Sequence, residues 1–209
     1  MRAILAVLLN FATEVSALQK RSHKLLASTL LETVQGFQAR RFELAFLFGS
    51  FQPDCNPLTY LKGSLRAHKF RGHNYANSQR YIYSRIIRLQ RRRRWTIWQY
   101  YTLGKLTHYL ADAFTYPHND NYPDSMLCHH QYETDLRAYL EKYLADREVR
   151  RENARRDVTL ALRRLHRQYM DGVADMRKDV QFILKATSVL MAGCLPESAA
   201  PCLPASAAA

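Results

Sequence analysis

Glycine is scarce in this sequence, and the motifs that depend on glycine are absent. Only 7 glycines occur among the 209 residues, which disfavours a turn-rich β fold. Neither Gly-x-Gly-x-x-Gly nor a phosphate-binding loop motif is present, so nothing indicates a glycine-rich nucleotide-binding fold. The chain also lacks an uninterrupted apolar run of about 18 residues, the length that a transmembrane helix requires.

Cysteine and acidic residues are scarce as well. The 4 cysteines lack the spacing of zinc fingers, and they are too few for a disulfide-dense scaffold. With 18 acidic against 31 basic residues, the net charge of +13 favours anionic partners such as phospholipid, nucleic acid or another phosphate ester. A chain of this length can bury enough surface to fold without a metal, so a metal site in it is expected to be functional.

The spacing of apolar residues predicts an all-α fold, a single-domain bundle of about seven helices around one core. Residues 1–194 are expected to form the domain, and the Ala/Pro/Ser-rich residues 195–209 a disordered tail. Residues 50–74, with several prolines and glycines, are expected to form a long connection that carries function. The helix at 95–114 is the most apolar and should lie at the centre. The predicted helices span residues 23–35, 40–48, 77–94, 95–114, 128–145, 150–171 and 173–191.

The N-terminal segment, residues 1–20, has two interpretations. Its apolar residues keep helical phase, which favours a retained amphipathic helix. The alternative is a signal segment that is cleaved after Ala17, although Glu14 is unfavourable so close to a cleavage site. The first interpretation favours a cytoplasmic or membrane-peripheral protein, and the second an exported one.

The residues that carry chemistry begin on the central predicted helix. His108 and Asp112 are four residues apart, so their side chains lie on one helix face. Pro117 places His118 at the end of this helix, where its ring can turn inward. His129 and Glu133 repeat the four-residue spacing on the next helix. Two such pairs on consecutive helices can face each other across a bundle, as they do in bundle-core metal sites.

These residue types fit zinc. Imidazole nitrogen and carboxylate oxygen bind zinc at about 2 Å, and a catalytic zinc keeps one position for water. A single His-x-x-x-Asp pair is usually only hydrogen-bonded, but six of the eight histidines lie within residues 50–74 and 108–130. This concentration predicts a metal cluster in the interior cleft of the bundle. Cys128 is not expected to bind metal, because its neighbour His129 has the better helical phase relative to Glu133.

The combined pattern resembles the zinc-dependent phospholipase C family, which is related to the trinuclear-zinc single-strand nucleases. The family pattern is His-x3-Asp-x5-His followed by His-x3-Glu, with an Asp and a His upstream and one His near the N-terminus. The resemblance covers roughly residues 22 to 140. The matching residues are His108, Asp112 and His118, then His129 and Glu133, with Asp54 as the upstream carboxylate and His23 as the N-terminal histidine.

The remaining upstream histidine is either His73 or His68, and the sequence around His73 is the closer match. The family usually completes its third zinc site with an N-terminal Trp, which this chain lacks; cleavage after Ala17 would instead expose Leu18. If no N-terminal residue takes this place, the third zinc site lacks two of its ligands. The resemblance implies a first zinc on Asp54, His73, His108 and Asp112, a second on His118, His129 and Glu133, and a third on His23 and Asp112.

The function implied is that of a zinc-dependent phosphodiester hydrolase with two or three zinc ions, in which a metal-held hydroxide attacks a phospholipid. Asp54 would either act as a catalytic base or simply bind metal. A nuclease or other phosphodiesterase with the same zincs is an alternative that stacking platforms would favour, whereas an apolar rim would favour lipid. A non-catalytic, metal-binding, membrane-associating protein is the other alternative.

The expected partners follow from the same argument. They are a phospholipid or another phosphodiester substrate and, peripherally, an anionic membrane, with nucleic acid less favoured. The run Arg91–Arg94 is expected to be a solvated helix end, with binding of anionic headgroups or nucleic acid as the alternative.

Overall fold

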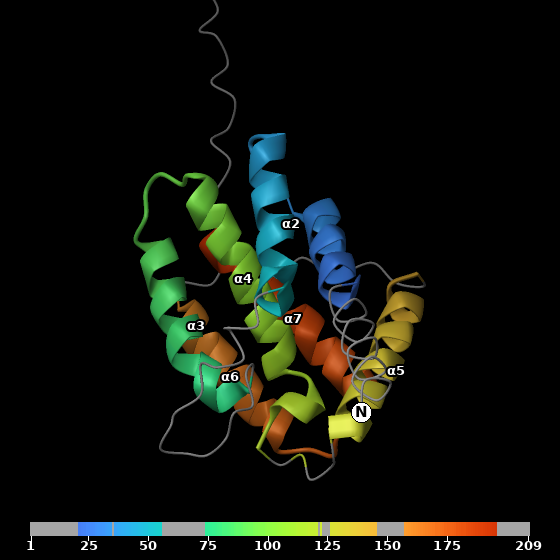
Figure 1. Cartoon of the computed structure of the whole chain (residues 1–209). Coiled ribbons are helices and arrows are strands. Elements are labelled where there is room, and N and C mark those ends of the chain that lie inside the picture. Colours follow the sequence, from blue (N-terminus) through green and yellow to red (C-terminus); the bar gives the residue numbers. More distant parts are fainter. Residues whose placement is uncertain are drawn as a thin grey trace, which may run out of the picture.

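The computed structural model describes residues 21–34, 36–55, 74–120, 122, 126–145 and 157–195. These residues form helices joined by turns, and no strand occurs among them, which confirms the all-α class (Figure 1). The helices are residues 21–33, α2 (Arg40–Cys55), α3 (Tyr75–Gln90), α4 (Ile97–Ala113), the 3-10 turn η2 (Tyr116–His118), α5 (Met126–Ala145), α6 (Val158–Met170) and α7 (Met176–Cys194).

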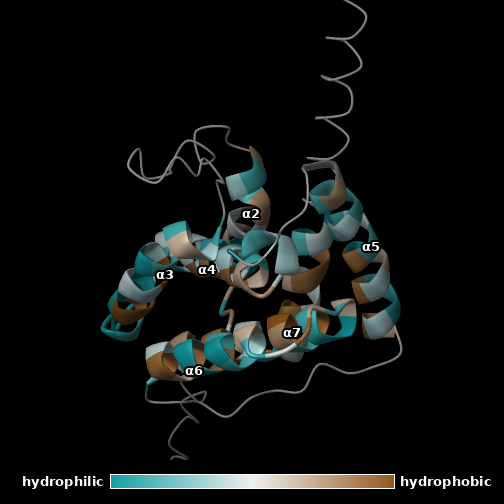
Figure 2. Ribbon diagram, turned by 90° about the horizontal axis from the view of Figure 1, so that it is seen from below, coloured by the Kyte–Doolittle hydropathy of each residue, from teal (hydrophilic) through white to brown (hydrophobic). Residues whose placement is uncertain are grey.

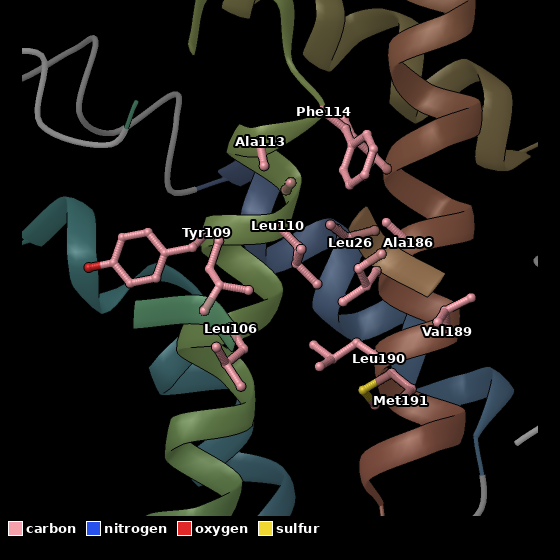
Figure 3. Close-up of a cluster of buried hydrophobic side chains, with 14 of the residues drawn as sticks. Leu26, Leu106, Tyr109, Leu110, Ala113, Phe114, Ala186, Val189, Leu190 and Met191 are labelled. Carbon is pink, nitrogen blue, oxygen red and sulfur yellow. The ribbon is translucent and has the colours of Figure 1, made fainter. Parts of the chain in front are cut away.

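Helix α4 lies at the centre of the bundle, as its apolar sequence predicts. It contacts α2, α3 and α7, and Leu103, Leu106 and Leu110 on it are all buried. Figure 3 shows the side chains of α4 facing those of α7, among them Leu190, across the core. Figure 2 shows the hydrophobic residues concentrated along α7. The residues that α4 carries are therefore held by packing on several sides.

Side-chain caps set where several helices begin. The Asn74 carboxamide oxygen accepts a hydrogen bond from the Ala76 amide at 2.7 Å, so α3 starts at Tyr75 rather than at the predicted residue 77. Thr96 and Gln99 form a capping box, which starts α4 two residues after the predicted position. The Asp175 carboxylate accepts a hydrogen bond from the Arg177 amide, so the helix predicted from residue 173 begins at Met176.

Helix α2 is longer than predicted, and the prediction that it ends at Gly49 was wrong. A β-carbon at Gly49 would overlap the Tyr101 carbonyl oxygen, and one at Gly104 would overlap the Phe46 carbonyl oxygen. The two glycines therefore allow α2 and α4 to approach closely, and Gly49 does not act as a helix stop. Because α2 continues through Pro53 to Cys55, its last turns carry residues that the sequence had assigned to a long loop.

Two other boundaries were also misplaced. Helix α3 ends at Gln90, so Arg91–Arg94 form an exposed turn between α3 and α4 and not the end of a helix. Helix α6 begins at Val158, where the Asp157 carboxylate accepts a hydrogen bond from the Leu160 amide at 2.8 Å, and not at residue 150. The caps and turn residues here outweigh the periodicity on which the predicted ends were based.

The predictions for residues 1–20, for most of the connection after Cys55, and for the tail beyond residue 195 lie outside the described residues. Within the described parts of the chain, no helix combines the length and the apolar character needed to cross a bilayer.

Candidate metal centre

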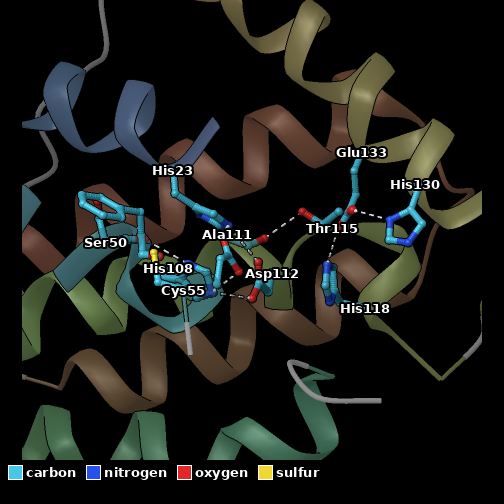
Figure 4. Close-up of polar contacts among 12 residues, drawn as sticks. His23, Ser50, Cys55, His108, Ala111, Asp112, Thr115, His118, His130 and Glu133 are labelled. Atoms are coloured by element: carbon cyan, nitrogen blue, oxygen red, sulfur yellow. Dashed lines mark hydrogen bonds and ion pairs between the residues drawn. The ribbon is translucent and has the colours of Figure 1, made fainter. Parts of the chain in front are cut away.

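Three helices bring together a first group of ligand-type side chains: His23 from the helix at 21–33, Asp54 from α2 and His108 from α4. Figure 4 shows His23 and His108 together with Asp112. The Nε2 atom of His108 lies 3.5 Å from Oδ1 of Asp54, and the Nε2 atom of His23 lies 3.8 Å from Oδ2 of the same carboxylate. Both His108 and Asp54 are buried. We call His23, Asp54 and His108, together with Asp112, the first group.

Asp112 faces both histidines of the first group. Its Oδ2 atom lies 3.3 Å from Nε2 of His108, and its Oδ1 atom lies 3.4 Å from Nε2 of His23. The first contact is the four-residue pair that the sequence predicts on α4. The second joins residues 89 positions apart in the chain (112 minus 23), which only the packing of the bundle can bring together.

The ring of His108 is held in the orientation that a metal ligand needs. Its Nδ1 atom lies 2.9 Å from the Ser50 carbonyl oxygen, and because a carbonyl can only accept, Nδ1 carries the proton. The lone pair of Nε2 is therefore directed at Asp54 and Asp112. Metal-binding histidines are usually fixed by such a hydrogen bond from their other ring nitrogen.

The distances within the first group fit a shared zinc ion better than direct hydrogen bonds. Its N–O separations run from 3.3 to 3.8 Å, which is long for hydrogen bonds between buried charged groups. Ligand atoms on a tetrahedral zinc with bonds of about 2.0–2.1 Å are separated by about 3.3 Å along each edge. Two imidazoles and two carboxylates are also a donor set that zinc accepts.

The second group consists of His118 from η2 and of His129 and Glu133 from α5. The Nε2 atoms of both histidines donate to the same Glu133 oxygen, Oε1, at 2.9 Å from His118 and 3.0 Å from His129. His130 lies beside the other oxygen, with its Nδ1 atom 3.6 Å from Oε2. The geometry thus makes His129 the closer neighbour of Glu133, as the helical phase predicts, but it also brings His130 near.

The carboxylates give both groups a strongly negative potential. Burial disfavours charge on His118, but the Asp112 carboxylate and the hydrogen bond to Glu133 outweigh it and raise the pKa of His118 to about 9. Burial likewise opposes charge on His23, and its contacts with Asp112 raise its pKa overall. Burial would raise the pKa of Glu133, but hydrogen bonds from His118 and His129 and the nearby His130 hold it well below its usual range. A site that stabilises added protons in this way also suits metal cations.

A buried carboxylate from α7 holds the elements of the second group together. Oδ2 of Asp179 accepts hydrogen bonds from the Tyr116 amide of η2 and from the Tyr132 hydroxyl of α5, both at 3.0 Å. Oδ1 accepts one from the Tyr169 hydroxyl of α6 at 2.7 Å. Burial raises the pKa of Asp179 to about 6, although these three hydrogen bonds oppose the shift. Sequence analysis missed this residue; the only signal was an acidic residue in phase with the apolar face of α7.

The segment after η2 is also held by a contact with α6. The Asn119 amide donates to the Thr115 carbonyl at 2.9 Å, and its oxygen lies 3.1 Å from Nε2 of His166. His166 stacks on Tyr75 of α3 with ring centroids 3.5 Å apart. Burial lowers the pKa of His166 to about 4, so its ring is neutral at physiological pH. His166 therefore acts here as a packed hydrogen-bond donor.

Both groups border one cavity. His23, Asp112, His118 and Glu133 line it on the side of the ligands, together with the side chain of Arg137. The remaining wall is mostly aliphatic, and the part that the structure describes contains no Phe, Tyr or Trp. The aliphatic residues of the wall are Leu26, Ala111, Leu136, Leu140, Val180 and Ile183.

The structure differs from the ligand assignment that the resemblance implies in one respect. That assignment paired His23 with Asp112 alone, whereas the structure also brings His23 beside Asp54 and His108. His73 and the alternative His68 lie outside the described residues. Cys128 is exposed, and so is Cys55, which follows Asp54 at the end of α2.

Comparison with known proteins agrees with this geometry. A family model described as zinc dependent phospholipase C matches residues 22–182, a range that contains both ligand groups and Asp179. Searches of curated proteins and of solved structures give no match. The match covers most of the chain, and the chain therefore belongs to the zinc-dependent phospholipase C family.

Proposed function

We propose that the protein is a zinc-dependent hydrolase that cleaves the phosphodiester bond of a phospholipid. The observation that carries the proposal is the arrangement of two ligand groups around one cavity, in a chain of the zinc-dependent phospholipase C family. Six of the proposed ligands come from widely separated positions yet meet in two compact sets. They are His23, Asp54 and His108 in one set, and His118, His129 and Glu133 in the other.

Asp112 connects the two groups in this proposal. It contacts both histidines of the first group, and its charge also raises the pKa of His118 in the second. A carboxylate in this position can bridge two metal ions. Bound zinc would supply Lewis acidity toward the phosphoryl oxygens and would lower the pKa of a bound water.

We assign Asp54 as a ligand in preference to a catalytic base. Its two oxygens face the Nε2 atoms of His108 and His23 at 3.5 and 3.8 Å, the same spacing that the other members of the first group keep. A ligand and a base respond differently to Asp54→Asn. Loss of a ligand lowers zinc content together with activity, whereas loss of a base lowers activity at full zinc content.

Arg137 is proposed to bind the phosphate of the substrate. It lies on α5 one turn after Glu133 and lines the same cavity, with its side chain only 19% exposed. It also pairs with the exposed Glu141, whose Oε1 atom lies 3.5 Å from Nε. A guanidinium in such a place can hold a phosphate through two parallel hydrogen bonds. Arg137→Lys should therefore raise KM more than it lowers kcat.

The aliphatic wall of the cavity supports lipid as the substrate. Leu136, Leu140 and Ile183 can contact the glycerol backbone and the first acyl carbons of a phospholipid. A nuclease would instead be expected to offer aromatic rings on which bases stack, and no such ring is found among the described residues that line this cavity. The proposal thus favours a phospholipid over a nucleic acid.

The experiment that tests the proposal is zinc quantitation coupled to hydrolysis of a soluble chromogenic phosphodiester, with and without a chelator. We expect bound zinc, hydrolysis that the chelator abolishes, and recovery when zinc is added back. The matched control is Asp135→Asn, which changes an exposed carboxylate on α5. A protein that binds zinc but hydrolyses neither this diester nor phospholipid would contradict the proposal and would support the non-catalytic alternative.

A further inference from the structure

One face of the bundle exposes large apolar side chains that the fold does not use. Four of the seven exposed large hydrophobic residues among the described ones lie on α2 and at the start of α4. Trp98 is 68% exposed, Leu44 52%, Phe48 51% and Ile97 44%. A contiguous exposed patch of large apolar side chains often marks an interaction site. We call these four residues the aromatic patch.

The aromatic patch is continuous across the two helices. The Tyr101 ring lies between its halves, with its centroid 5.9 Å from that of Phe48 on α2 and 6.1 Å from that of Trp98 on α4. Leu44 lies one turn before Phe48, and Ile97 one turn before Tyr101, so each shares its helix face. The close crossing at Gly49 and Gly104 holds the two halves in this register.

Cations border the patch. Lys105 lies 5.8 Å above the Tyr101 ring, and Lys24 lies 4.4 Å above the Phe51 ring next to Phe48. The exposed run Arg91–Arg94 is separated from the first turn of α4 only by Trp95 and Thr96. The nearest acidic residue of α2, Glu43, pairs with Arg40 at 2.6 Å. The border of the patch therefore carries a clear excess of positive charge.

We propose that the aromatic patch docks the protein on the surface of an anionic phospholipid bilayer. Trp and Tyr favour the headgroup level of a membrane, where their apolar rings and polar tips are both satisfied. Basic residues beside them gain from the negative potential of anionic lipid. The choice of a lipid surface as the partner rests on the proposed function, in which phospholipid is the substrate.

The patch also adjoins the first ligand group. Phe51 lies three residues before Asp54 on α2, and Lys24 above its ring follows His23 directly in the chain. Phe51 on α2 and Lys24 on the helix at 21–33 therefore lie beside a ligand residue of their own helix. A lipid surface that docks here would therefore lie beside the helices that carry His23 and Asp54.

The binding test uses the full-length, zinc-loaded protein and sedimentation with phosphatidylcholine vesicles, with and without phosphatidylglycerol. We expect binding that strengthens with phosphatidylglycerol and weakens with salt. Phe48→Ala and Trp98→Ala should each lower the partition coefficient about tenfold, because each removes a large apolar side chain from the contact. The matched control is Val173→Ala, which removes an exposed apolar side chain between α6 and α7 and should leave binding unchanged.

Two double variants test how positive charge contributes to vesicle binding. Replacing Arg92 and Arg93 by Gln should weaken binding to phosphatidylglycerol vesicles about fivefold for each residue, and less at high salt. The same double replacement at Arg164 and Arg167 on α6 removes equal charge from an exposed face elsewhere and should have a smaller effect. Equal losses from the two pairs would show that only net charge matters and would overturn the assignment to this face.

The fluorescence of Trp98 can report directly whether the aromatic patch contacts lipid. The chain has 2 tryptophans, so Trp95→Phe leaves Trp98 as the only one. Brominated lipids should quench its fluorescence on binding. Unquenched fluorescence in the bound state, or association of Trp98 with a second copy of the chain or another protein in place of vesicles, would overturn the proposal.

These results separate docking from catalysis. Hydrolysis of a soluble diester without vesicle binding would leave the proposed function standing and refute the docking surface. Vesicle binding that depends on Phe48 and Trp98, without hydrolysis of any diester, would support the docking surface and contradict the enzyme. Loss of vesicle hydrolysis in Trp98→Ala with the soluble diester still hydrolysed would support both.

Discussion

The two ligand groups are built on different principles. The first joins side chains from three helices, and its members stay 3.3 to 3.8 Å apart. The second draws on one turn and one helix, and its two histidines close onto a single Glu133 oxygen at 2.9 and 3.0 Å. Asp54, Asp112 and His108 of the first group are buried, whereas the members of the second are partly exposed.

The difference shows what holds each group. Backbone packing keeps the first group open, because α2 and α4 meet through glycine and cannot shift to shorten its contacts. The second group can relax into hydrogen bonds, and it depends on Asp179 to keep η2 and α5 in place. We therefore expect the first group to keep its ligand spacing without metal, whereas metal binding to the second must break the hydrogen bonds from His118 and His129 to Glu133.

Asp112→Ala should have the largest effect, because this residue connects the two groups. Its loss removes a carboxylate that contacts His23 and His108 and that acts on the charge of His118. We expect loss of most bound zinc and a fall in hydrolysis of at least about 100-fold, as for removal of a metal-site carboxylate. Zinc analysis and diester hydrolysis measure both. Full zinc content in this variant would refute the connecting role.

Neighbouring histidines on α5 sharpen the comparison within the second group. His129→Ala removes a hydrogen-bonded partner of Glu133 and should weaken zinc binding by about 10–100-fold. His130→Ala removes a side chain 3.6 Å from the other oxygen and should cost much less. Titration of each variant with zinc against a competing chelator compares them directly. Equal losses would mean that His130 shares the ligand role.

Asp179→Asn tests how the second group is positioned. The amide cannot accept all three hydrogen bonds as strongly as the carboxylate, so η2 and α5 lose their common anchor. We expect zinc affinity of the second group to fall by about tenfold, with the first group unaffected. Tyr169→Phe is the matched control, because it removes the one hydrogen bond that reaches neither η2 nor α5. A uniform loss from both groups would indicate general destabilisation instead.

Gly104→Ala should break the preorganisation of the first group. The new methyl group would overlap the Phe46 carbonyl oxygen, and backbone cannot give way as a side chain can. We expect unfolding to require about 3 kcal/mol less free energy, measured by urea denaturation of the metal-free protein. Gly172→Ala is the control, since its methyl group would meet only the flexible end of Lys178. A destabilisation no greater than that of the control would argue against the close crossing.

A smaller effect concerns pH and the support behind η2. The folded-state pKa of His166 is about 4, below its ordinary value of 6.5, so the unfolded chain binds the extra proton first. Stability contributed by neutral His166 is therefore present above pH 6.5 and is lost as the pH falls toward 4. We expect the free energy of unfolding to fall by about 2 kcal/mol between pH 6.5 and pH 5. His166→Gln keeps a donor for Asn119 and should flatten this slope in metal-free protein.

The local part of the site could be predicted from the sequence. Helical spacing alone places His108 with Asp112 and His129 with Glu133, because residues four apart share a face. His23 was connected to this cluster only through the family resemblance, since nothing in its local sequence fixes where its helix packs. The structure brings all five of these residues into the two candidate ligand groups.

Tertiary packing decided what the sequence could not predict. Gly49 and Pro53 are normally helix breakers, yet contact with α4 requires the first and α2 continues through the second. Asp54, which the sequence analysis placed in a loop, therefore lies on the last turn of α2. Asp179 was missed because a single acidic residue on an apolar face gains meaning only when its tyrosine partners on other helices are known.

The shared helices of the aromatic patch and the first ligand group set a fixed distance. Phe48 and Asp54 are six residues apart on α2, which corresponds to a rise of about 9 Å along the helix. Because the patch lies along the sides of α2 and α4, this rise would run parallel to a docked lipid surface. The candidate metal centre would therefore lie beside the lipid contact, displaced toward the C-terminal end of α2. A phospholipid would have to enter from that end of the patch to be cleaved.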